Sequence, residues 1–84
     1  MRPIFIMVKC ELGRAYDTAE HAVDEIEEVS EIYSISGQFD LMIKCYLPED
    51  MDVGRFVNSR IHALPHIRDT MTLITFNAFA GGKG

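Results

Sequence analysis

The sequence predicts an α+β domain in which both helices cover the same face of a four-stranded antiparallel sheet. Three observations indicate this fold class. Four segments alternate apolar side chains with the two-residue period of a strand, and two segments repeat them at helical spacing. These segments follow one another in the order β-α-β-β-α-β. The chain has 84 residues, 48% of them hydrophobic, which suits a single small globular domain.

The first half of the chain contains a strand at residues 4–10, a helix at residues 15–28 and a strand at residues 30–36. Apolar side chains occupy both faces of residues 4–10, so we expect a central strand there. In the helix, apolar side chains recur at i, i+3, i+4 and i+7, and acidic side chains cover the outer side. The inner stripe of this helix consists of Ala15, Ala19, Ala22, Val23 and Ile26.

A hairpin joins the two middle strands of the predicted sheet. Residues 37–40 are expected to form its turn, in which Gly37 supplies the positive φ that a tight hairpin needs. Residues 41–47 then alternate again and predict the third strand, which Pro48 ends.

The remaining segments supply a second helix and a last strand. Asp50 is the expected N-cap of a helix at residues 51–63, and Pro65 ends this helix. β-Branched side chains are frequent in residues 68–78, which predicts a strand there.

Two βαβ halves joined by a hairpin form the ferredoxin-like plan, for which right-handed crossovers predict the strand order 4-1-3-2. The two helices can cover only one face of this sheet. The opposite face is expected to carry six large apolar side chains: Phe5, Met7, Met42, Tyr46, Met71 and Leu73. Because burying each contributes about 1.5–3 kcal/mol, we expect two sheets to pack face to face as a dimeric α+β barrel.

Composition narrows the class of protein. The net charge of −5 argues against a domain that binds nucleic acid by itself, because such binding depends on neutralising phosphates. No apolar run is long enough to span a membrane or to form a signal peptide, so a cytoplasmic protein is expected. Cys10 and Cys45 are predicted to be buried free thiols and not a disulfide.

Known catalytic and metal-binding patterns do not occur in the chain. His62 and His66 have the spacing of two ligands on one helical turn, but Pro65 between them disrupts that geometry. No Ser or Cys lies beside a His, and the chain has neither a Walker loop nor a GxGxxG motif. We therefore expect no metal, no cofactor, no catalytic residue and no enzymatic activity.

Two segments carry the motifs that remain, residues 32–41 and residues 64–72. The first follows the pattern V/I-Y-x-h-x-G-x-Y/F-D-h, where h is hydrophobic, and the second follows L-P-x-V/I-x-x-T-x-T. Taken alone, they indicate only a hairpin turn supported by Asp40 and a threonine-rich strand. Together and in this order, they make the chain, up to about residue 79, resemble the effector-binding (RAM) domain of the Lrp/AsnC transcriptional regulators.

This resemblance implies a function. Domains of this family bind small effectors, usually amino acids, between dimers that assemble into rings, commonly octamers. Carried over, the pocket would combine a turn from one dimer with a strand from its neighbour, and Asp40 would pair with the effector's ammonium group. Threonine hydroxyls and N–H groups near Gly37 would receive the carboxylate. The implied ligand-binding residues are Ser36, Gly37, Gln38, Phe39, Asp40, Thr70, Met71 and Thr72.

The chain departs from full-length regulators because it starts at the first strand of the sheet, without their helix-turn-helix. It resembles a stand-alone form in which residues 1–80 are one ligand-binding and oligomerisation domain and residues 81–84 are a flexible tail. DNA binding is therefore not carried over, although co-assembly with full-length Lrp/AsnC regulators is a further possibility. Phe39 stands where the family usually has tyrosine.

Two alternatives remain open from the sequence. One is a purely structural assembly module that binds no ligand. The other is a small dimeric α+β-barrel enzyme of the cofactor-free monooxygenase type, since this fold plan hosts several functions. Such an enzyme would hold a His, Asn or Tyr in a deep pocket within each monomer, whereas His21, His62 and His66 are expected near the periphery.

Overall fold

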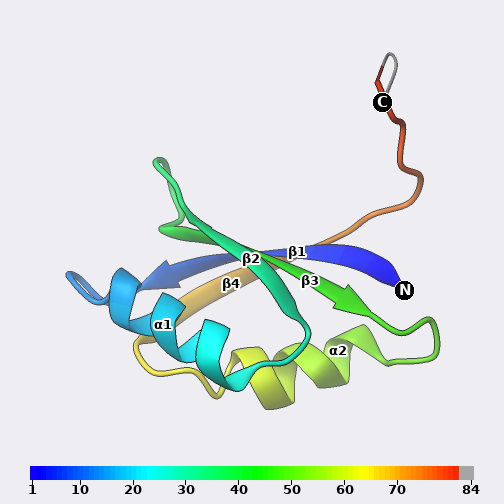
Figure 1. The fold of residues 1–84 in the computed structure, drawn as a ribbon. Coiled ribbons are helices and arrows are strands. Elements are labelled where there is room, and N and C mark those ends of the chain that lie inside the picture. Colours follow the sequence, from blue (N-terminus) through cyan, green and yellow to red (C-terminus); the bar gives the residue numbers. More distant parts are fainter. Residues whose placement is uncertain (82–84) are drawn as a thin grey trace.

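Four antiparallel strands form one sheet in the order β2-β3-β1-β4, which confirms the predicted order (Figure 1). The computed structural model describes residues 1–81, so the predicted tail at residues 82–84 lies outside the described residues. β1 is central and pairs with both β3 and β4. The elements are β1 (Arg2–Cys10), α1 (Ala15–Glu25), β2 (Val29–Ser34), β3 (Leu41–Leu47), α2 (Val53–Phe56), the π-helix η1 (Val57–Ile61) and β4 (Ile67–Ile74).

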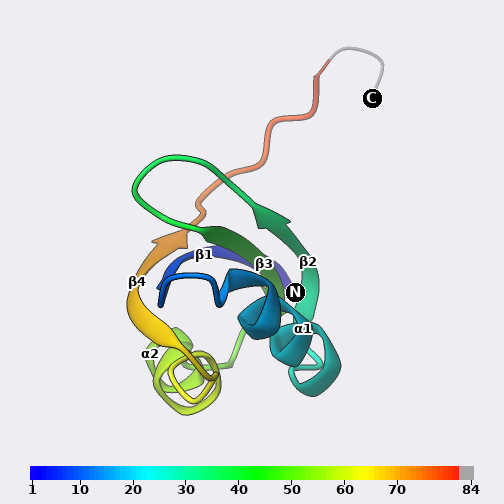
Figure 2. The same ribbon diagram turned by 90° about the vertical axis from the view of Figure 1, so that its left-hand side faces the viewer.

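The helices α1 and α2 lie on the same side of the sheet, and the other side carries no helix of the described residues (Figures 1 and 2). The alternation of β1 explains this arrangement, because Ile4, Ile6 and Val8 are fully buried while their neighbours in sequence are not. β3 repeats the pattern, with Leu41, Ile43, Cys45 and Leu47 all buried. The core therefore lies between the helices and one face of the sheet. Among residues 1–81, no helix is long and apolar enough to cross a membrane.

The boundaries of α1 and β4 differ from those predicted. α1 ends at Glu25, not at residue 28, because Ile26 adopts an extended conformation with ψ of 106°. The acidic residues that follow would oppose the helix dipole at this end. Val23, expected in the inner stripe, is 61% exposed, whereas Thr18 and Ala22 of the same helix are fully buried. β4 ends at Ile74, four residues before the predicted end.

The N-cap of the second helix was predicted at Asp50, and this prediction is wrong. Asp52 caps α2 instead, because its Oδ1 accepts a hydrogen bond of 3.0 Å from the N–H of Arg55. Asp50 lies within the preceding turn, in which the N–H of Met51 donates to the carbonyl oxygen of Pro48. After Phe56 the helix widens into η1, where the N–H of His62 reaches the carbonyl oxygen of Val57.

The open face of the sheet carries the six apolar side chains predicted for it. Phe5 and Met7 lie beside Leu73 and Met71 of β4, and Met42 lies beside Met7 on the other side. Met71 is 44% exposed and Leu73 is 43% exposed, while Phe5, Met7 and Met42 are half-buried by their neighbours. Apolar surface on this scale is unusual on a monomer.

Cys10 and Cys45 are both free and buried, as predicted. Burial raises the pKa of the Cys45 thiol from its ordinary value of 9.0 to about 12, and the negative charge of Glu28 acts in the same direction. Between these two values, the unfolded thiol ionises while the folded thiol keeps its proton. Below about pH 9 the thiol is protonated in both states, and between pH 9 and pH 12 the ionisation of the unfolded thiol progressively lowers the stability of the folded state.

We therefore predict that the free energy of unfolding of Cys45→Ala falls less steeply than that of the wild type between pH 9 and pH 12. The slope due to one such thiol is at most about 1.4 kcal/mol per pH unit. Urea unfolding at a series of pH values measures the free energy of unfolding of both proteins. An equal dependence on pH in the two proteins would contradict the prediction.

Candidate functional site

Asp40 extends the pairing of β1 and β3 beyond their last paired residues. Its N–H donates to the carbonyl oxygen of Val8 at 2.8 Å, and its Oδ2 accepts a 2.8 Å hydrogen bond from the N–H of Cys10. The carbonyl oxygen of Asp40 also accepts from the N–H of Ile35, which closes the turn between β2 and β3 at 3.0 Å. Gly37 in this turn has a φ of +107°, as the sequence predicted for a glycine there. The Asp40 carboxylate is thus held at the end of the central strand.

A pocket of about 370 Å³ opens beside this carboxylate. Two cationic side chains, Lys9 and Arg68, line it together with two acidic ones, Asp40 and Glu11. An apolar rim is formed by Leu12, in the connection between β1 and α1, and by Tyr16, in the first turn of α1. Leu12 is 96% exposed and Tyr16 is 72% exposed. The remaining lining residues are Cys10, Gly13 and Ala15. The pocket therefore combines side chains of both charges with two large, exposed apolar side chains.

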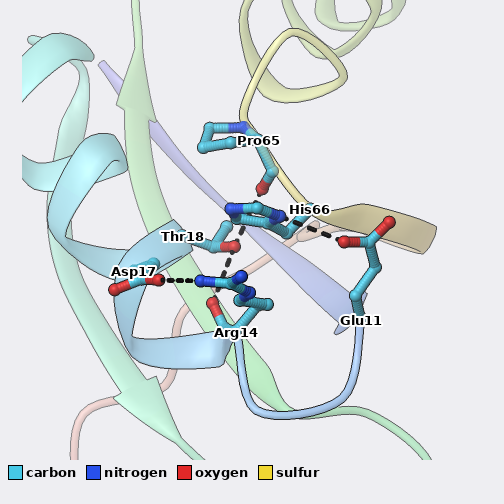
Figure 3. A network of polar contacts seen from close by, with 6 residues as sticks. All are labelled: Glu11, Arg14, Asp17, Thr18, Pro65 and His66. Atoms are coloured by element: carbon cyan, nitrogen blue, oxygen red, sulfur yellow. Dashed lines mark hydrogen bonds and ion pairs between the residues drawn. The ribbon is translucent and has the colours of Figure 1, made fainter.

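The rim is fixed to the body of the protein by a polar network (Figure 3). The N–H of Glu11 donates to the carbonyl oxygen of His66 at 2.9 Å, and Glu11 Oε1 lies 3.0 Å from His66 Nδ1. The buried Thr18 hydroxyl lies 2.9 Å from the carbonyl oxygen of Pro65 and 3.1 Å from that of Arg14. His66 has a positive φ of 66°, which is uncommon for a side chain other than glycine. These contacts join the β1–α1 connection to the segment before β4.

The thiol in this pocket is not an activated nucleophile. Burial raises the pKa of Cys10; the hydrogen bond with Thr18 opposes that effect, and the charge of Asp40 adds to it. The thiol therefore stays protonated at neutral pH, whereas catalytic cysteines need a lowered pKa. Among residues 1–81, no three His, Cys, Asp or Glu side chains gather in a way that could hold a metal ion.

The predicted ligand-binding residues fall into two groups separated by β1. Asp40 lines the pocket, and the carbonyl oxygen of Gln38 accepts a hydrogen bond of 3.3 Å from Lys9 Nζ. Ser36 and Gly37 are exposed in the turn, and Phe39 is half-buried.

Thr70, Met71 and Thr72 lie on β4, on the far side of β1, where they pair with Val8, Met7 and Ile6 respectively. Thr70 lines a second depression of about 500 Å³, and its hydroxyl lies 2.9 Å from His62 Nε2. Met71 points to the open face. Within one chain, the structure therefore does not bring the two groups together.

Sequence reasoning missed the residues that complete the pocket, namely Lys9, Glu11, Leu12, Tyr16 and Arg68. The predicted strand order held a signal for the charged ones. In an antiparallel sheet of order 4-1-3-2, the end of strand 1 meets the starts of strands 3 and 4. Charged side chains at those positions had to share one edge of the sheet with Asp40. Arg68 and Glu11 line both the pocket beside Asp40 and the second depression.

Comparison with known proteins identifies the class of protein to which this fold belongs. The model of the Lrp/AsnC ligand-binding domain matches residues 4–82, and the chain belongs to this family. It is 31% identical over 65 residues to the proline dehydrogenase transcriptional activator of Rhodobacter capsulatus, covering 77% of this chain and 42% of that protein. It is 25% identical over 75 residues to the leucine-responsive regulatory protein of Escherichia coli K12, covering 84% of this chain and 46% of that protein.

A solved structure of similar length agrees with this assignment. The crystal structure of TTHA0845 from Thermus thermophilus superposes with a TM-score of 0.83 at 27% identity. This match covers 96% of the present chain and 100% of that chain. By contrast, the chain spans less than half the length of the two regulators. The family is therefore that of a regulatory ligand-binding domain, with the ferredoxin-like fold that the sequence predicted.

The Thr18 contact provides a test of how the pocket rim is held. Thr18→Val keeps the shape of the side chain but removes the hydroxyl that lies within hydrogen-bond distance of the Pro65 and Arg14 carbonyl oxygens. We predict a loss of about 1–2 kcal/mol in the free energy of unfolding, measured by urea denaturation. Ser59→Ala is the matched control, because the exposed Ser59 hydroxyl also donates to a carbonyl oxygen, that of Arg55. It should cost less than about 0.5 kcal/mol, and equal losses in the two variants would contradict the prediction.

Proposed function

We propose that this chain is an amino-acid-sensing regulatory module that binds its effector in the pocket beside Asp40 and assembles through its exposed apolar surfaces. The observation that carries this proposal is that Asp40 and Arg68, which have opposite charges, line one pocket. An amino acid is a zwitterion, so it needs an anionic and a cationic partner close together. The volume of about 370 Å³ falls in the range of small-molecule sites.

Each charged group has a role in this proposal. Asp40 uses Oδ2 for the N–H of Cys10, which leaves Oδ1 to accept from the effector's ammonium group. Arg68 receives the effector's carboxylate, with Lys9 as a second cation. Glu11 is already paired with His66, so it serves mainly to hold the rim.

Assembly would complete the site. Leu12 and Tyr16 leave large apolar surfaces in water at the mouth of the pocket, which favours a cover from a neighbouring dimer. Such a neighbour would bring the second group, Thr70 and Thr72 with Met71, toward the effector in this pocket. The turn residues Ser36, Gly37, Gln38 and Phe39 would border the same junction. A ligand bound between dimers stabilises the assembled state by mass action, which converts effector concentration into oligomeric state.

The wider role follows from the family. We propose that residues 1–80 act as one ligand-binding and assembly unit in the cytoplasm, where two free thiols remain reduced. The net charge of −5 favours action through protein partners, such as full-length Lrp/AsnC regulators, over direct contact with DNA. A ligand-free assembly module is the second candidate, and the open face of the sheet favours it equally.

Calorimetric titration with the twenty amino acids separates these two candidates. We predict that at least one amino acid binds the wild type and that Asp40→Asn weakens it tenfold or more, because a charge-assisted bond is lost. Asparagine keeps an oxygen for the N–H of Cys10, so the turn stays folded.

Asp69→Asn is the matched control, since Asp69 lies at the same edge but lines only the second depression. It should bind as the wild type does. The proposal of a sensor would be withdrawn if no amino acid bound, or if both variants bound with wild-type affinity.

Sedimentation tests the assembly. We predict that the wild type forms dimers or larger rings and that Met71→Glu and Leu73→Glu shift it toward monomers, because a buried carboxylate would face the second sheet. Val23→Glu is the control: Val23 is 61% exposed, more than either of these residues, but it lies on the helical side, so the dimer should persist. A wild type that remains monomeric at high concentration would refute the face-to-face dimer.

A further inference from the structure

The chain continues past β4 as an extended segment that leaves the body of the protein. Residues 75–81, here called the aromatic tail, project from the side of the sheet away from the helices in both views (Figures 1 and 2). Two phenylalanines lie in it, of which Phe76 is 95% exposed and Phe79 is 90% exposed. None of the seven residues carries a charge. Exposed aromatic rings on an uncharged segment are a surface that water disfavours.

The start of the tail is fixed next to the open face. The Thr75 hydroxyl donates to the carbonyl oxygen of Pro3 at 2.7 Å, which ties the tail to the beginning of β1. Between the tail and the open face lies a groove of about 950 Å³. Phe5 and Tyr46 form one wall of this groove, and Phe76 and Phe79 form the opposite wall. Both walls are aromatic, so the occupant should be apolar.

The charged side chains that line this groove are Arg2, Lys44 and Glu49, and each already has a partner. Arg2 donates to the carbonyl oxygen of Met51 at 3.1 Å, and Glu49 pairs with the N-terminal ammonium group at 3.4 Å. Lys44 Nζ lies 5.2 Å from the centre of the Tyr46 ring and 6.0 Å from that of Phe5, and it pairs with Glu31 at 3.8 Å. Its charge is therefore already balanced by a carboxylate and by two aromatic faces. An incoming apolar surface would not have to compensate it.

The tail is long enough to extend past a second copy docked on the open face. A second sheet packed on the open face would lie about 10 Å away. Seven extended residues reach up to about 23 Å, more than twice that distance. Because the tail rises from the same side of the sheet, it must pass beside a second copy docked there. In a two-fold symmetric pair the same contact then occurs twice.

We propose that the aromatic tail is a clasp: the second copy of this chain lodges between the tail and the open face, and Phe76 and Phe79 pack against it. The proposal rests on the face-to-face dimer of the proposed function and adds an interface that the sheet faces alone do not provide. It explains why the tail combines two rings with no charge. By symmetry, each copy holds the other.

The test compares two double variants within the tail. Phe76→Ser with Phe79→Ser removes both rings, whereas Asn77→Ser with Ala78→Ser changes the two residues between them and keeps the rings. Because all four side chains are exposed, both variants should fold as the wild type does, which circular dichroism checks. We expect the dimer dissociation constant of the first variant to rise on the order of 100-fold or more, and that of the control to change little. Equal dissociation constants would overturn the clasp.

A cross-linking experiment locates the contact. Benzoylphenylalanine is placed at position 79 of a tagged chain, which is mixed with an untagged chain labelled with ¹⁵N. Irradiation should join position 79 of the tagged chain to ¹⁵N-labelled peptides from the sheet of the other chain. Cross-links confined to one chain, or directed to the helices of the other, would overturn the clasp.

The outcomes separate this inference from the proposal on which it rests. A wild type that stays monomeric would overturn both the dimer and the clasp. A wild type that dimerises and binds an amino acid, with a dissociation constant unaffected by loss of both rings, would overturn the clasp alone.

Discussion

The structure depends on one constraint: its two helices cover only one face of the four-stranded sheet, yet the chain places apolar side chains on both faces. The covered face forms the core. The open face, with Phe5, Met7 and Met42 half-buried and Met71 and Leu73 more exposed, retains surface that the monomer cannot remove from water. A small domain buries a modest fraction of its unfolded surface, so association is a common source of further stability. The same feature therefore bears on stability and on function.

The candidate site follows from the topology of the same sheet. Because β1 is central and antiparallel to both neighbours, its final residues meet the first residues of β3 and of β4. Asp40 and Arg68 approach one pocket from those two starts, although a strand, a helix and their connections separate them in the sequence. Asp40 also completes the hydrogen bonding of β1 through the N–H of Cys10. The carboxylate is thus positioned by the backbone of the strand beside which it lies.

The fold could be predicted from the sequence, whereas the site could be predicted only in part. Alternation in residues 4–10 and 41–47 identified the buried face, and the crossover rule identified the strand order. The N-cap was misassigned because Asp50 and Asp52 are equally suitable by residue type, and only the turn at Pro48 decides between them. No motif or periodicity in the sequence marks Leu12 and Tyr16 as residues of the site. Their position depends on how Thr18 and His66 fix the connection between β1 and α1, which is a tertiary contact.

The separation of Asp40 from Thr70 by β1 relates the site to the assembly. Asp40 and Thr70 line different depressions of the monomer, so a site that uses both would draw them from different copies. Two-fold packing through the open face, as proposed, would leave the sheet edge with Asp40, Arg68 and the exposed Leu12 free for such a junction. Effector binding and ring formation would then be one equilibrium, because the ligand would be bound fully only where two dimers meet. A change in effector concentration would shift oligomeric state without any rearrangement inside the fold.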